Sequence, residues 1–264
     1  MATGKLPVIA TAVEAIKLPL RYPWEFIRFG CLTLGLSLLM GWLDSSASTP
    51  RDHPVFEIVG VLVFLLGFLA STFVIAPFEV TWIRLTLNGP SNVTDRPIWV
   101  FGKPERQLLV AELALSLIAG APGILAFIIA LIVHQTTALM VVMLFVAAGL
   151  LVVGFGCSIR LSFILIEVAL QRYDDWRNSW HQTRGRIWRL IGIGLLASLP
   201  YGIAASLFGG WIFFGHASGL VMVGGEIVEV LLTFAGVTAG WSALALAYQF
   251  TAPEPSQTVT VATS

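Results

Sequence analysis

Six long apolar runs follow one another along the chain, separated by short polar connections. They cover residues 24–43, 58–76, 108–133, 138–159, 190–211 and 219–249. Each run is close to the ~20 residues that a helix needs to cross the hydrocarbon core of a bilayer. Lipid offers backbone groups no hydrogen-bond partner, and the apolar positions are continuous rather than alternating, so the runs predict helices. The pattern predicts an all-α polytopic membrane protein whose six transmembrane helices form three hairpins.

Two amphipathic segments, residues 8–22 and 173–184, predict helices that lie in the plane of the membrane at its cytoplasmic face. In the second segment Trp176 and Trp180 are four residues apart, on one face, as in an interfacial helix. In the first segment polar and apolar residues separate onto two faces. One face holds Ile9, Val13, Ile16 and Leu20, and the other holds Thr11, Glu14, Lys17 and Arg21.

The distribution of basic residues predicts the orientation of the helices. Lys and Arg crowd the N-terminus, the second connection and the fourth connection, whereas the third and fifth connections have none. By the positive-inside rule, both termini are expected in the cytoplasm. Residues 1–250 then form a single transmembrane domain, and we expect the small polar tail 251–264 to be disordered.

Composition narrows the function classes. The 264 residues are 57% hydrophobic and only 11% charged, whereas soluble domains carry about 25% charged residues. Six helices and their connections leave no room for a separate soluble catalytic domain. The formal net charge is zero, so no global field attracts nucleic acid. Cys31 and Cys157 lie in apolar runs near the cytoplasmic end, and we expect no disulfide.

Acidic residues inside the apolar runs are the first candidates for chemistry. Glu226 and Glu229 are three residues apart and share one helix face, and Glu112 lies early in the third run. Carboxylates at membrane depth are costly and usually face water, the protein interior or a partner. They predict an ion, proton or polar-substrate site. The alternative is that they lie near the membrane surfaces and reach water there.

Nine basic and aromatic residues lie in and beside the fourth connection, and we call this group the collar. Its members are Arg160, Arg172, Arg177, Arg184, Arg186, Arg189, Trp176, Trp180 and Trp188. It predicts binding of anionic lipid headgroups or of a cytoplasmic partner. Such a partner would belong with this chain to a larger membrane protein complex. The alternative is that it only sets the topology and anchors the chain at the interface.

Motifs of soluble chemistry are absent from the sequence, which contains no P-loop, no G-x-S-x-G, no H-E-x-x-H and no C-x-x-C. His53, His134 and His216 lie one on each outer connection, but no two are spaced as ligands on one element. The sequence therefore predicts no catalytic residue, no metal site and no cofactor.

Three stretches carry a resemblance to a known group of proteins. They are Trp82–Gly89, Arg160–Ile164 and Ser179–Leu190. They resemble uncharacterised bacterial inner-membrane proteins that are similar to the glycerophosphoryl diester phosphodiesterase membrane domain and to the YciC-like family. The resemblance implies a bacterial inner-membrane location and an all-helical fold with six spans. It does not imply phosphodiesterase activity, because in such fusions catalysis belongs to a separate soluble domain.

Together these patterns predict a non-enzymatic integral inner-membrane protein: a scaffold, accessory subunit or lipid-interacting protein in membrane homeostasis. The alternative is a small transporter or channel that uses Glu226, Glu229 or Glu112. One observation separates the two hypotheses. The transporter hypothesis is favoured if these glutamates, together with the helix breaks expected at Pro122 and Pro200, converge on one water-filled cavity, and it loses its support if they face lipid, headgroups or another subunit.

Overall fold

The computed structural model describes residues 6–46, 54–93, 95–97, 99–132, 137–172, 175–214 and 220–251. Within these ranges every regular element is helical, so the predicted all-α class is confirmed. The elements are α1 (Val8–Arg21), α2 (Pro23–Ser46), α3 (Pro54–Asn88), the 3-10 turn η1 (Pro90–Asn92), α4 (Lys103–Ile132), α5 (Thr137–Leu161), α6 (Phe163–Ala169), α7 (Trp176–Gln182), α8 (Ile187–Phe214) and α9 (Leu220–Thr251). The expected disordered tail lies outside the described residues, apart from Thr251 at the end of α9.

Each of the six apolar runs corresponds to one long helix, namely α2, α3, α4, α5, α8 or α9, except that residues 133 and 219 at the ends of two runs lie outside the described residues. Within the described residues, three stretches are long and apolar enough to cross a membrane, namely Phe145–Ala169, Ile187–Gly210 and Val223–Thr251. The helix break expected near Pro122 is not present, since α4 is continuous from Lys103 to Ile132. Likewise, α8 continues through Pro200.

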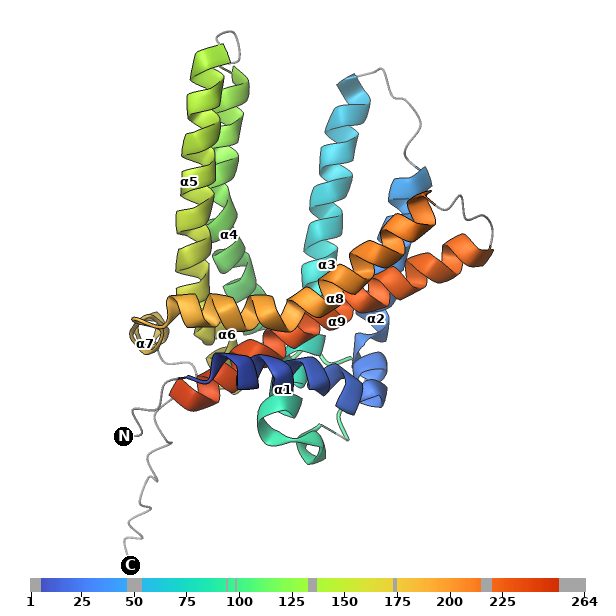
Figure 1. The fold of residues 1–264 in the computed structure, drawn as a ribbon, viewed down its shortest axis with the longest axis vertical. Helices are drawn as coiled ribbons and strands as arrows, with labels where there is room; N and C mark the ends of the chain where they lie inside the picture. The colour runs from blue at the N-terminus through green and yellow to red at the C-terminus, as the bar shows by residue number, and fades with distance from the viewer. Residues whose placement is uncertain are drawn as a thin grey trace, which may run out of the picture.

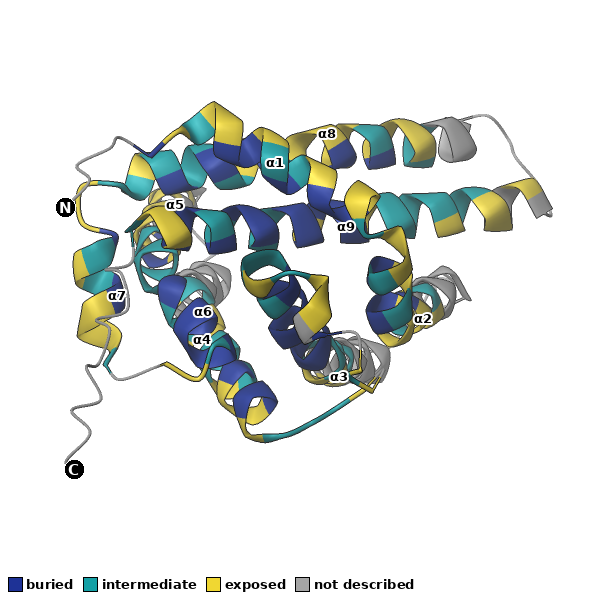
Figure 2. Cartoon of the chain, turned by 90° about the horizontal axis from the view of Figure 1, so that it is seen from below, coloured by how far each residue is buried: buried dark blue, intermediate teal, exposed yellow. Residues whose placement is uncertain are grey.

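The long helices pack as pairs that converge at one end of the molecule and spread apart at the other (Figure 1). α4 runs beside α5, and α8 runs beside α9. Buried residues concentrate at the converging end, on α1, α3, α6 and α9 (Figure 2). There the rings of Phe26, Phe78 and Trp82 stack or meet edge to face, and the ring of Phe234 packs against Phe26 and Phe78 at a tilt. Trp82 Nε1 donates to Ser242 Oγ at 2.8 Å.

α1 lies across α8 and α9, but its contact face differs from the predicted one. Ile9 and Leu20 are exposed, whereas Ala12, Ala15 and Leu18 are buried. The small residues of α1 face the protein because they allow close helix contact, and its large apolar residues face away from the protein. The predicted polar face is wrong at Thr11, which is buried. The hydroxyl of Tyr201 donates to the Ile16 carbonyl at 2.8 Å and attaches α1 to α8.

A buried ion pair closes the connection between α3 and α4. The side chains of Arg96 and Glu105 are 14% and 1% exposed and form a salt bridge. The other Glu105 oxygen accepts from the backbone N–H of Gly102 at 2.8 Å, and Arg28 Nη2 donates to the Arg96 carbonyl at 2.9 Å. The second turn of α2 and the first turn of α4 are thereby joined through the loop that contains Arg96.

Candidate functional site: an acidic cavity

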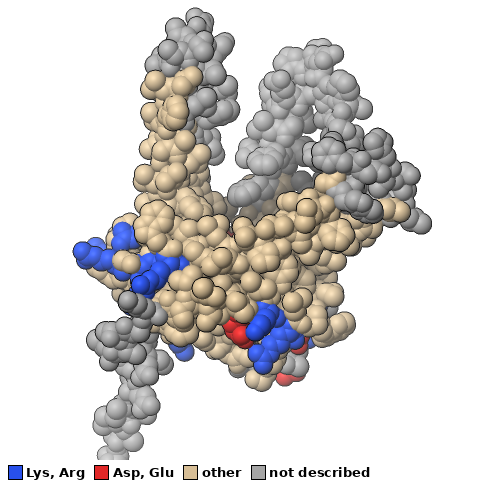
Figure 3. All heavy atoms as spheres, viewed as in Figure 1, with Lys and Arg blue, Asp and Glu red and all other residues tan. Residues whose placement is uncertain are grey.

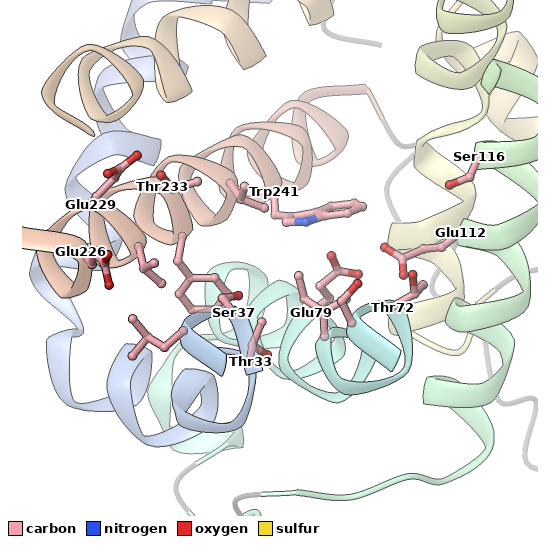
Figure 4. Close-up of a pocket in the computed structure, with 16 residues that line it drawn as sticks. Thr33, Ser37, Thr72, Glu79, Glu112, Ser116, Glu226, Glu229, Thr233 and Trp241 are labelled. Atoms are coloured by element: carbon pink, nitrogen blue, oxygen red, sulfur yellow. The ribbon is translucent and has the colours of Figure 1, made fainter. Parts of the chain in front are cut away.

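A cavity of about 650 Å³ opens between α2, α3, α4 and α9 (Figure 4). Its lining combines four carboxyl groups with six hydroxyl groups, and none of the described side chains that line it is basic. The carboxyl groups belong to Glu79, Glu112, Glu226 and Glu229, and the hydroxyl groups to Thr33, Ser37, Ser71, Thr72, Ser116 and Thr233. Such a lining disfavours anions and attracts cations.

One face of α9 forms a wall of this cavity. Lining residues recur from Glu226 through Glu229, Thr233 and Val237 to Trp241, at spacings of three or four residues. This is the spacing of positions that share a helix face. At a rise of 1.5 Å per residue, the fifteen steps along α9 from Glu226 to Trp241 span about 22 Å. The lined face of α9 is therefore about three quarters as long as the ~30 Å hydrocarbon core of a bilayer.

At one end of the cavity Glu79 of α3 and Glu112 of α4 turn their carboxyl groups toward one another (Figure 4). The two groups are within hydrogen-bonding reach, and the indole N–H of Trp241 is directed at Glu79. One oxygen of each carboxyl, Oε2, is buried and receives no hydrogen bond from any described residue. Two facing carboxylates are both acceptors, so they can be joined only by something that supplies a donor or a positive charge: a shared proton, a cation or a bridging water.

At the other end lie Glu226 and Glu229, both on α9 and both half-buried. The carboxyl group of Glu229 lies against Gly209 of α8: a Cβ built on that glycine would come within 2.7 Å of Glu229 Oε2. Glu229 also lines a second hollow between α8 and α9. The absence of a side chain at Gly209 therefore leaves this carboxylate room between two helices.

Two of the hydroxyl groups, those of Thr33 and Ser37 on α2, lie between the two acidic pairs (Figure 4). Thr233 of α9 lies beside Glu229, and Thr72 of α3 lies beside Glu112. Thr33 Oγ1 is buried without a hydrogen-bond partner among the described residues. Hydroxyl oxygens both accept and donate, so they can replace part of the hydration shell of a cation or relay a proton.

The structure brings together all three glutamates that the sequence singled out. It adds Glu79, which sequence analysis missed because the residue follows the second apolar run in a stretch expected to leave the membrane. The available signal was a carboxylate among Phe78, Val80 and Trp82 with no basic residue adjacent. Neither of the two expected proline breaks contributes, since α4 and α8 are continuous and Pro200 is exposed outside this cavity.

The collar gathers around α7 and the beginning of α8 (Figure 3). Its parts differ in their contacts. The guanidinium of Arg160 lies 3.9 Å from the centre of the Trp180 ring, and the Arg160 carbonyl accepts from Ser179 at 2.9 Å and Thr183 at 3.0 Å. Arg160 and Trp180 thus hold α7 against the end of α5.

The remaining members of the collar face outward. Arg172, Arg177, Arg184, Trp176 and Trp188 are exposed, and Arg186 and Arg189 are half-buried. The second predicted interfacial helix is shorter than expected. It covers Trp176–Gln182, and the Asp175 side chain accepts from the backbone N–H of Arg177 at its start.

The three histidines considered for a metal site, His53, His134 and His216, lie outside the described residues. Within the described ranges, no three His, Cys, Asp or Glu residues are grouped so that they could hold a metal ion.

Comparison with known proteins does not test the resemblance to bacterial inner-membrane proteins described above, which stays a prediction. No family model, no curated protein and no solved structure matches this chain.

Proposed function

We propose that this chain is an integral membrane protein with six spans that moves protons or small cations across the bilayer through the acidic cavity. The proposal is non-enzymatic and adopts the transporter or channel alternative of the sequence analysis. One observation carries it: four glutamates from three helices converge on a single elongated cavity whose described lining contains no basic side chain.

The free-energy cost of burying carboxyl groups is the reason to assign this cavity a function. Carboxylates in a membrane protein are expensive, and a buried acceptor without a donor costs about 1–3 kcal/mol. Glu79 and Glu112 each carry such an oxygen. Ionisable groups inside a membrane protein commonly mark a binding or transport site, so the pair is proposed as the inner binding site. Glu226 and Glu229 are proposed as the outer site, and the hydroxyl groups as the path between them.

The orientation follows from the positive-inside rule. α9 begins at an outer connection and ends in the cytoplasm, so Glu226 and Glu229 lie toward the outer membrane face. The convergence of α3 and α4 then puts Glu79 and Glu112 toward the cytoplasm. A cation entering from outside would meet one acidic pair first and leave from the other.

The experiment is a flux measurement on the full chain in proteoliposomes that contain a pH-sensitive or a cation-sensitive dye. An imposed gradient should produce flux through the wild-type protein. Glu79→Gln, Glu112→Gln and Glu229→Gln should each lower it to nearly that of protein-free vesicles, because glutamine keeps the shape and removes the charge. The matched control is Glu14→Gln, which makes the same change on α1 outside the cavity. Flux that is absent in the wild type, or unchanged in all three cavity variants, would contradict the proposal.

A second candidate function is the scaffold, accessory or lipid-interacting role. The observation that favours it is the outward-facing part of the collar around α7. If this role holds, replacing Arg177, Arg184, Arg186 and Arg189 by Gln should reduce the anionic lipid that co-purifies with the protein. Loss of lipid with normal flux would assign the collar and the cavity to separate tasks.

A further inference from the structure

A second hollow, of about 790 Å³, lies on the side of α4 that faces α5, α6 and α7. It is separate from the acidic cavity, and the two share no lining residue. One face of α4 provides most of its wall, from Lys103 at the start of the helix to Ile118. The opposite wall consists of Leu161, Ile164, Val168 and Trp176.

The two ends of this groove differ in chemistry. Lys103, Arg106 and Gln107 occupy one end, and the α4 residues that line the groove beyond them are all apolar: Val110, Ala111, Ala114, Leu115 and Ile118. The groove therefore has a basic, hydrogen-bonding entrance and an apolar interior. This division matches an amphiphile with an anionic head.

The basic end is available for a ligand. Lys103 and Arg106 are exposed, and neither is in a salt bridge with an acidic residue of the described chain. Their acidic neighbour in sequence, Glu105, is turned inward and paired with Arg96. Arg106 Nε donates to the Gly102 carbonyl at 3.3 Å, which positions the guanidinium near the entrance.

The apolar part is nearly as long as the hydrocarbon of one leaflet. From Val110 to Ile118, α4 rises about 12 Å, compared with ~15 Å of hydrocarbon per leaflet, half of the ~30 Å core. Val110 and Ile118 are 66% and 41% exposed, so the groove is open along its side and a lipid could enter laterally. Trp176, 51% exposed, stands on α7 where indole rings prefer the membrane interface.

We propose that this groove binds one anionic phospholipid, with its phosphate at Lys103 and Arg106 and an acyl chain along Val110, Ala114 and Ile118. The occupant is a lipid rather than a free anion, because apolar side chains continue directly from the basic end. It would stabilise the junction of α4 with α6 and α7 by filling the space between them. This site lies outside the predicted collar except for Trp176.

Native mass spectrometry of the full chain in detergent, with added phosphatidylglycerol or phosphatidylcholine, tests the site. Each basic side chain near an anionic headgroup contributes about fivefold in affinity, so Lys103→Gln with Arg106→Gln should weaken phosphatidylglycerol binding about thirtyfold. The matched control is Lys17→Gln with Arg21→Gln, two exposed basic residues on α1. Phosphatidylcholine should bind weakly to all of these proteins.

A second variant tests the acyl-chain part with every charge intact. Ala114→Phe fills the groove and should also reduce phosphatidylglycerol binding, whereas Leu117→Phe, on a face of α4 outside the groove, should not. Inorganic phosphate should fail to displace the lipid. The site is overturned if the α1 control loses as much lipid as the groove variant. It is also overturned if Ala114→Phe binds normally, or if phosphate alone displaces the lipid.

Discussion

Glu79 of α3 and Glu112 of α4 face one another across the end of the acidic cavity, and each has a buried oxygen that receives no hydrogen bond from the described residues. A pair of this kind is costly unless something lies between its members. This pair is the observation on which the proposed binding site at the inner end of the cavity rests.

The first prediction concerns the stability of this pair. Glu79→Gln supplies an amide donor to Glu112 and removes one buried charge, so it should raise the free energy of unfolding by about 1–3 kcal/mol. Thermal unfolding of the detergent-solubilised protein measures the change. Glu14→Gln on α1, where the carboxylate is 47% exposed, should be nearly neutral. Destabilisation by Glu79→Gln would mean that the carboxylate is structural.

The buried ion pair between Arg96 and Glu105 should be essential for folding. Glu105→Gln leaves the guanidinium of Arg96 buried without its counter-ion, and breaking such a pair costs about 3–5 kcal/mol. The control is the exposed pair of Arg177 and Asp175, whose side chains are 71% and 45% exposed. Arg177→Gln should cost no more than about 1 kcal/mol. Equal effects of the two substitutions on the unfolding midpoint would show that burial does not matter here.

Close contact between α4 and α5 depends on Gly154. A Cβ at this position would come within 2.6 Å of the Ala119 carbonyl oxygen and 2.8 Å of the Ile118 carbonyl oxygen. Because backbone atoms cannot move aside, Gly154→Ala should destabilise the hairpin by about 1–3 kcal/mol.

Gly149 is the matched control for this substitution. It lies on the same helix, with nothing within 4 Å of its Cβ position. Gly149→Ala should be neutral or stabilising by up to about 1 kcal/mol, as helix propensity alone predicts. If Gly154→Ala is equally harmless in thermal unfolding, the two helices do not pack as described.

Hydrophobic runs predicted the helices well because each run of about twenty apolar residues has one low-energy conformation in lipid. The hydrophobic pattern did not predict which face of a helix packs against the rest of the protein. On α1 the large residues Ile9 and Leu20 are exposed, and the small residues Ala12 and Ala15 are buried. Lipid and protein interior are equally apolar, so hydropathy cannot distinguish them, and residue size is the better signal.

The candidate site was only partly predictable for a related reason. Glu226 and Glu229 could be paired from their spacing on one helix. Bringing them into one cavity with Glu79 and Glu112 depends on how α3 packs against α9 and α4 against α3, and no sequence period encodes those contacts. The lipid groove depends in the same way on α7, a helix of only seven residues that is held by the Arg160 carbonyl.

The most direct test of the acidic cavity is its accessibility to charged thiol reagents. In a chain with Cys31 and Cys157 replaced by Ser, Thr233→Cys puts a thiol inside the cavity, and Ile227→Cys puts one on α9 outside it. An acidic, water-filled cavity should make a cationic methanethiosulfonate react at least about tenfold faster than an anionic one at position 233. Position 227 should show no such preference. No reaction at position 233, or equal rates for the two reagents there, would contradict an acidic path through the membrane.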